Sequence, residues 1–141
     1  MKLIVIMLFA CVFGAAALAQ KPVPDWVRVA ETAGWTPRDS AGELVYHDQM
    51  WLFGGWFQSF EAPPRDVWRS PDGKTWTRVT EAAPWIHSDL PMTLVFDDRM
   101  WIMGGWYNGR LPGCSASNQV WWSTDGAAWQ QATPAAGWSP R

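Results

Sequence analysis

Few side chains in this chain of 141 residues are arranged for chemistry. Asp39 and Asp89 lie 50 residues apart in similar surroundings, and two carboxylates can act as a general acid and a general base. An aspartate repeated before successive strands more often caps backbone amides, and we expect that role here. His47 and His87 do not lie at equivalent positions, and no clustered Cys or carboxylate accompanies them. The sequence therefore predicts no catalytic residue, no metal and no other cofactor.

The first nineteen residues are typical of a secretory signal. Lys2 precedes an apolar stretch at residues 3–14, and residues 17–19 (Ala-Leu-Ala) form a small-residue cleavage site. We expect cleavage after Ala19 and export to the periplasm or the exterior. A lipid anchor on Cys11 is a weaker alternative, because the residues after it stay apolar. No later stretch is long and apolar enough to span a membrane.

The charges and cysteines exclude several classes of protein. A net charge of −2, with scattered charges, provides no electrostatic reason to expect nucleic acid as a partner. After cleavage only Cys114 remains, so no intrachain disulfide can form. We expect Cys114 to be a small loop or core residue, the alternative being a reactive thiol. Stability must therefore come from the burial of aromatic side chains.

Tryptophan carries the clearest pattern in the sequence, which has 13 of them. All except Trp122 recur at a spacing of 50 or 53 residues. The sets are Trp26, Trp76 and Trp129; Trp35, Trp85 and Trp138; Trp51 and Trp101; Trp56 and Trp106; Trp68 and Trp121. A fixed period near 50 residues is typical of repeat architectures.

Each repeat unit contains four short segments that read as β-strands. They are residues 43–46, 50–53, 67–69 and 75–79 in the first unit, and 93–96, 100–103, 120–122 and 128–132 in the second. Polar turns join the first two segments, and Asp-Gly turns join the last two. Pairs of glycines end the second segment of each unit, where we expect positive φ or close backbone packing: Gly54 and Gly55, then Gly104 and Gly105. The fold class predicted is all-β.

Two motifs carry a resemblance to a known family. Residues 95–106 read Val-Phe-Asp-Asp-Arg-Met-Trp-Ile-Met-Gly-Gly-Trp, and the pattern Val-Trp-x-Ser-x-Asp-Gly-x-x-Trp occurs at 67–76 and at 120–129. Together they resemble the kelch repeat in its bacterial exported form, over nearly all of residues 26–141. The resemblance implies a kelch-type, galactose oxidase-like β-propeller with blades of four antiparallel strands. Residues 70–76 also resemble the Asp-box of sialidase-type propellers, one residue short, which implies the same fold.

In either motif the Ser and Asp side chains are expected to hold the turn, with Trp76 and Trp129 packed beneath it. The expected organisation is a signal peptide at 1–19, an N-terminal strand and lead-in at 20–34, blades at 35–84 and 85–137, and the truncated start of a third repeat at 138–141. Residues 26–30 align with the fourth strands, so we expect a lone fourth strand there.

Two units are too few to close a ring. The chain is then either an N-terminal fragment, whose remaining blades lie in a longer chain, or one of several copies that assemble into a ring. A ring of copies would leave one surplus fourth strand per chain, which favours the fragment.

The loops after the glycine pairs differ most between the units, and such loops often carry recognition. We expect ligand contacts from Phe57, Phe60, Tyr107 and Arg110, and from the unrepeated Trp122; Trp56 and Trp106 are expected in the core. The resemblance implies an exported scaffold that binds protein or glycan. The alternative is part of a sugar-processing propeller enzyme, similar to sialic acid mutarotases or copper oxidases, with its catalytic residues outside this chain. Tyr46 reads as a strand core residue, which speaks against the oxidase.

Overall fold

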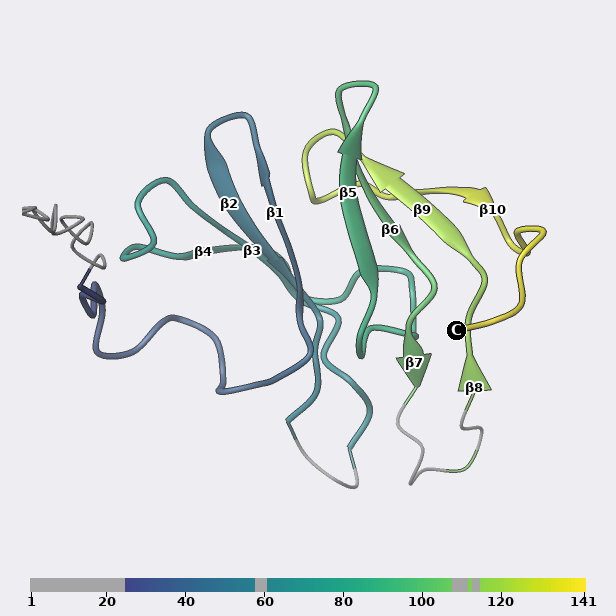
Figure 1. Cartoon of the computed structure of the whole chain (residues 1–141), viewed down its shortest axis with the longest axis horizontal. Coiled ribbons are helices and arrows are strands. Elements are labelled where there is room, and N and C mark those ends of the chain that lie inside the picture. The colour runs from purple at the N-terminus through teal and green to yellow at the C-terminus, as the bar shows by residue number, and fades with distance from the viewer. Residues whose placement is uncertain (1–24, 58–60, 108–111, 113–114) are drawn as a thin grey trace, which may run out of the picture.

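The chain folds into strands, turns and loops, with no helix among the residues that the structure describes (Figure 1). The structure is a computed structural model that describes residues 25–57, 61–107, 112 and 115–141. No helix long and apolar enough to cross a membrane occurs in this part of the chain. The all-β class predicted from the sequence is confirmed.

Two antiparallel sheets of four strands make up most of the fold, and in each sheet the strands lie side by side in sequence order. The first sheet contains β1 (Gly42–Tyr46), β2 (Gln49–Phe53), β3 (Val67–Ser70) and β4 (Thr77–Thr80). The second contains β5 (Met92–Phe96), β6 (Arg99–Met103), β9 (Val120–Ser123) and β10 (Gln130–Thr133). Every strand end lies within two residues of its predicted position. A repeat of four antiparallel strands is therefore confirmed.

The first hairpin of each sheet turns on two residues with left-handed backbone. φ is 49° at His47 and 56° at Asp48, and it is 51° at both Asp97 and Asp98. Two consecutive positive φ values give a turn whose twist matches that of the flanking strands. Asp tolerates this conformation better than most residues, because its short side chain can bond locally.

The second hairpin of each sheet is organised by a serine and an aspartate. In the second sheet the Gly126 amide donates to Ser123 Oγ at 2.8 Å, and the Ala127 and Ala128 amides donate to Asp125 Oδ1 at 2.9 Å. The Trp129 indole N–H donates to the Gly126 carbonyl at 2.9 Å. The first sheet repeats these bonds with Ser70, Asp72, Gly73, Lys74, Thr75 and Trp76. The expected structural role of this motif is confirmed.

The two sheets stack, and the core lies between them. β1 lies beside β5 at the centre of the molecule (Figure 1). From the second sheet, the Trp129 ring packs edge to face on Phe53 of the first sheet, with centroids 5.7 Å apart. It packs in the same way on Trp85, which lies in the linker between the two sheets, with ring centroids 4.4 Å apart. Met100 and Ile102 of β6 are buried on the same side. One face of each sheet thus makes the core.

Residues 26–30 form no strand, which corrects the prediction of a lone N-terminal fourth strand. Trp26 is fully exposed and Val27 is 76% exposed. A fourth strand in this fold pairs with the third strand of its own sheet, as β4 pairs with β3. Residues 26–30 have no such partner in the described part of the chain, and a strand without a ladder partner gains nothing to offset its ordering.

A short ribbon extends the second sheet's longer loop and was not predicted. β7 (Trp106–Tyr107) pairs with β8 (Ser115–Ala116) in antiparallel fashion. The segment at residues 135–141 then follows the second sheet as the linker at 82–88 follows the first. The Ala136 amide donates to the Asn118 carbonyl at 2.9 Å, as the Ala83 amide does to Arg65 at 2.8 Å.

The glycine pairs let the linkers pass close to the ends of β2 and β6. Gly105 has φ 94°, and a Cβ at this position would collide with the His87 carbonyl oxygen. Gly55 has φ 99°, and a Cβ there would lie 2.6 Å from the Asp39 carbonyl oxygen. Both expected reasons for glycine therefore hold at these positions.

Replacing Gly105 by Ala should destabilise the fold by more than about 2 kcal/mol, because the new Cβ meets both a left-handed backbone and a backbone oxygen. Gly137→Ala is the matched control, since no atom lies within 4 Å of a Cβ there. It should change stability by less than about 1 kcal/mol. Urea unfolding of the two variants tests this, and equal midpoints would contradict it.

Asp125→Ala should cost about 1 kcal/mol at neutral pH, because two backbone amides lose their acceptor. The bonds from the Ala128 and Ala127 amides lower the pKa of Asp125. The stabilisation is therefore complete above the ordinary carboxyl pKa and is lost as the pH falls through the lowered value. Thermal unfolding across this range should show the wild-type advantage shrinking in acid. Asp25→Ala serves as an exposed control, and an advantage independent of pH would be evidence against this account.

Candidate functional site

The stacked sheets present two different ends (Figure 1). The loop end holds the connections after β2 and β6 and the linker residues that lead into β1 and β5. The hairpin end holds the turns at 47–48, 71–76, 97–98 and 124–129. The loops in which ligand contacts were predicted belong to the loop end.

The two linker aspartates are fixed at the loop end by their backbone. Asp39 exchanges two backbone hydrogen bonds with Trp56, each 2.9 Å long. Asp89 does the same with Trp106, at 3.1 and 2.7 Å. The residues after them, Ser40 and Leu90, have φ of 54° and 52° and are joined by a backbone bond of 2.9 Å. It is the backbone of each aspartate, rather than its carboxylate, that makes these bridges.

The Asp39 and Asp89 carboxylates lie close enough to influence each other. Burial raises the pKa of Asp89, and the negative charge of Asp39 raises it further, while a hydrogen bond with the Ser40 side chain lowers it. Two neighbouring carboxylates can exchange a proton with a ligand, or they can accept hydrogen bonds from the hydroxyl groups of that ligand. Among the described residues, no group of three or more His, Cys, Asp or Glu could hold a metal ion.

His87 and Tyr107 make a second cluster at the loop end. His87 Nε2 lies 2.8 Å from Ser115 Oγ, and the rings of His87 and Tyr107 meet edge to face with centroids 6.4 Å apart. Burial lowers the pKa of His87, which therefore carries no charge at neutral pH. Its Nδ1 is buried without a hydrogen-bond partner in the described structure. The cluster offers an aromatic ring and neutral polar atoms.

A pocket of about 230 Å³ opens between the loops of the two repeats. Its lining residues are Ala62, Pro63, Arg65, Ile86 and Tyr107. Of the predicted ligand residues, Tyr107 lies in this pocket, and Phe57 lies outside it with 37% of its surface exposed. Phe60 and Arg110 lie outside the described residues, as does Cys114.

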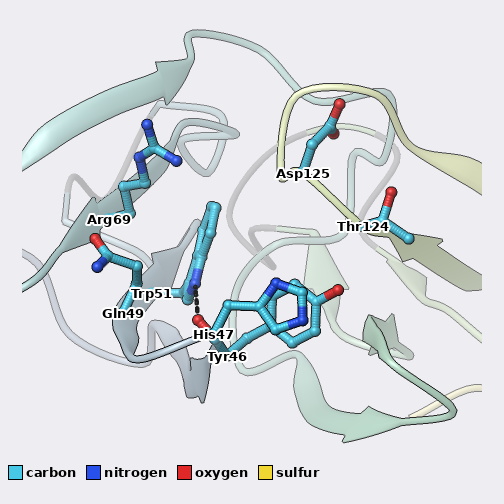
Figure 2. A pocket seen from close by; sticks show the side chains of 7 residues that line it. All are labelled: Tyr46, His47, Gln49, Trp51, Arg69, Thr124 and Asp125. Atoms are coloured by element: carbon cyan, nitrogen blue, oxygen red, sulfur yellow. Dashed lines mark hydrogen bonds between the residues drawn. The ribbon is translucent and has the colours of Figure 1, made fainter.

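A larger pocket, of about 450 Å³, lies at the hairpin end and was not predicted (Figure 2). The first sheet contributes Tyr46, His47, Gln49, Trp51 and Arg69, and the second contributes Thr124 and Asp125. In Figure 2 the Trp51 ring stands between the Arg69 side and the Asp125 side of the pocket. No sequence signal separated these residues from ordinary turn and core positions, because the pocket exists only where the two sheets meet.

The polar contacts of this pocket are mostly used within the protein. The His47 ring stacks on the Tyr46 ring at 3.9 Å, and His47 Nε2 lies 2.8 Å from Asp98 Oδ1. The Tyr46 hydroxyl donates to the Asp98 carbonyl at 2.8 Å, and the Trp51 indole donates to the Tyr46 carbonyl at 3.1 Å. Tyr46 is buried, as expected of a core residue. The two contacts with Asp98 tie the first sheet to the second.

The remaining predicted ligand residue, Trp122, lies in neither pocket. It is half-buried on β9, with its ring 6.5 Å from that of Trp101 and the Arg99 guanidinium 4.3 Å from its ring centroid. It belongs to the outer face of the second sheet and not to the loop end. Trp106, expected in the core, is 37% exposed.

Asp39→Asn should lower the pKa of Asp89 while leaving it above the ordinary carboxyl value, because burial, the larger cause, remains. An NMR titration of the Asp89 side-chain carboxyl carbon measures this. Asp48→Asn, at the hairpin end, should leave that titration unchanged. An Asp89 pKa that does not respond to Asp39→Asn would show that the two carboxylates are not coupled.

Comparison with known proteins adds nothing to the geometry: no family model and no curated protein sequence matches this chain. The kelch resemblance therefore rests on the repeat pattern in the sequence.

Proposed function

We propose that this chain is an exported kelch-type module that binds protein or glycan through its loop end. Two four-stranded antiparallel sheets that stack with β1 beside β5 are the arrangement expected of neighbouring blades in a propeller, which supports the kelch assignment. Export rests on the signal-like residues 1–19, which lie outside the described residues.

The pocket between the loops of the two repeats is the observation that carries the proposal. It joins apolar surface, from Pro63 and Ile86, to the Tyr107 ring and the polar Arg65 side chain. Small-molecule and sugar sites commonly combine an apolar or aromatic floor with a few polar groups that fix orientation. The Arg65 guanidinium is anchored by a bond of 3.1 Å to the Ala83 carbonyl, so it is already oriented before a ligand arrives.

The polar groups at the loop end suit a hydroxyl-bearing ligand. His87 is uncharged at neutral pH, and the Asp39 and Asp89 carboxylates can accept hydrogen bonds from hydroxyl groups. Phe57 and Tyr107 provide exposed or half-exposed rings for the apolar side of a sugar or for a protein side chain. We therefore place glycans first among the expected ligands and proteins second.

Tyr107→Ala should weaken binding at least about tenfold, the loss of one well-placed aromatic contact. The measurement is an array of immobilised glycans, followed by titration of any hit, with Phe57→Ala as a second loop-end variant. Gln49→Ala, at the hairpin end, is the control and should bind like the wild type. Unchanged binding by both loop-end variants, or loss of binding by Gln49→Ala, would reject the loop end as the binding site.

A sugar-processing enzyme is the second candidate, and the Asp39–Asp89 pair is the observation in its favour. A carboxyl group whose pKa is raised by burial and by a neighbouring carboxylate is a common acid–base arrangement. If it acts in this way, Asp89→Asn should abolish turnover of a bound sugar while leaving its affinity within about threefold. If turnover survives the Asp89→Asn substitution, acid–base catalysis by the Asp39–Asp89 pair is excluded.

A further inference from the structure

The two sheets of this chain are equivalent, but opposite faces of them are covered: the face of the first sheet that bears Trp51 packs on the second sheet, whereas the same face of the second sheet is open. Residues that occupy the same place in the two sheets lie 50 or 53 positions apart in the sequence. On the covered face of the first sheet, Tyr46 is 4% exposed, and Trp51 and Val67 are also buried. At the equivalent places on the second sheet, Phe96 is 68% exposed, and Trp101 and Val120 are half-buried.

This exposed face, which we call the donor face, is a groove of about 480 Å³. It is lined by Leu94, Val95, Phe96, Trp101 and Met103, all of them apolar. In the first sheet the corresponding surface is covered by the 124–129 hairpin of the second sheet. There Gly126 lies so close to Trp51 that a Cβ on it would overlap the indole ring. An apolar groove of this kind marks an interaction site.

The opposite outer face of the molecule has the matching chemistry, and we call it the acceptor face. Met50 is 42% exposed, whereas its equivalent Met100, which packs on the first sheet, is 0% exposed. A groove of about 550 Å³ on this face is lined by Met50, Gly73 and Trp76 of the sheet, and by residues 27–30, Ala33 and Trp35 of the N-terminal segment. The equivalents of Gly73 and Trp76 are Gly126 and Trp129, the residues that pack on Trp51 and Phe53 inside the chain.

We propose that a second copy of this chain docks its acceptor face on the donor face of the first, head to tail. Gly73 of the second copy would then lie over Trp101, as Gly126 lies over Trp51, and Trp76 would pack on Met103, as Trp129 packs on Phe53. The contact repeats an interface that the chain already contains between its own sheets. It is heterologous, so each added copy leaves one donor and one acceptor face open until a ring closes.

Two segments must exchange places for the copies to meet. Residues 135–141 of the first copy occupy the linker position on its second sheet, through bonds such as that from the Gly105 amide to the Arg141 carbonyl at 2.9 Å. The second copy brings residues 32–38 to the same position. Both segments contain Ala-Gly-Trp, one further residue and Pro-Arg, so the incoming one can make the same backbone bonds. The exchange costs little, and burial of the donor face provides the net gain.

The N-terminal segment lies against part of the acceptor face and must move aside, since residues 27–30 line its groove and Val29 Cγ2 lies 3.9 Å from a Cβ placed on Gly73. A fourth strand at 26–30 would have been surplus in a ring of copies, but these residues form no strand. Their backbone makes no hydrogen bond to the sheet in the described structure. This inference rests on the stacking of the sheets and is independent of ligand binding at the loop end.

Sedimentation velocity on the chain, purified as the cell processes it, tests the proposal over a range of concentrations. The wild type should grow beyond a monomer. Phe96→Asp on the donor face and Met50→Asp on the acceptor face should each weaken association about 30-fold or more. Both side chains are exposed in the single chain, so the variants should fold, which circular dichroism checks. Ile86 is also exposed but lies on neither of these faces, so the Ile86→Asp variant should associate like the wild type.

Mixing the two variants gives the decisive result, because each retains the face that the other has lost. The mixture should form a one-to-one dimer and stop there. Deleting residues 135–141 should tighten association by removing the segment that must leave. A wild type that stays monomeric, a mixture that stays monomeric, or weaker association after the deletion would each overturn the proposal.

Discussion

The packing of one sheet on the next is the interaction on which this structure depends. A four-stranded antiparallel sheet has two faces, and a single sheet of this size has nothing of its own to cover either. Here the Trp129 ring is wedged between Phe53 and Trp85, and Gly126 rests on Trp51. Strand pairing, hairpin geometry and the path of the linkers all bring these few side chains to the interface between the sheets. The pocket at the hairpin end and the meeting of the loops at the other end are consequences of it.

The hairpins and linkers are built so that the stacking can repeat. The Ser-Asp hairpin satisfies its own amides, which leaves Gly126 free to approach a neighbouring ring and Trp129 free to pack below. Positive φ at Gly55 and Gly105 lets the linkers pass close enough to join one sheet to the next. Each of these features appears in both repeats. The chain therefore contains one sheet-to-sheet interface, and its donor and acceptor faces each form one half of a further interface of the same kind. Local turn chemistry and long-range assembly are thus linked through the same residues.

Much of the fold could be predicted, because strands, turns and glycine pairs leave local signals in the sequence. The eight main strands and the roles of Ser123 and Asp125 follow from alternation, turn residues and repetition. The prediction of a strand at 26–30 was wrong, since similarity to β4 cannot supply the neighbouring strand that β4 pairs with. Of the predicted ligand residues, Tyr107 lies in a pocket, whereas Trp122 lies on a sheet face. Sequence similarity identifies equivalent positions but does not say which of them is covered.

The sequence by itself determined the repeat, the number of strands in each unit and the chemistry of each turn. These depend on residues a few positions apart, and on a period that is visible without coordinates. Only the tertiary structure decided that Trp51 is buried while its equivalent Trp101 is half-exposed, and that Asp39 and Asp89 influence each other. The physical reason is that burial and charge coupling depend on which surfaces meet. In a repeat, equivalent residues meet different neighbours according to their place in the stack.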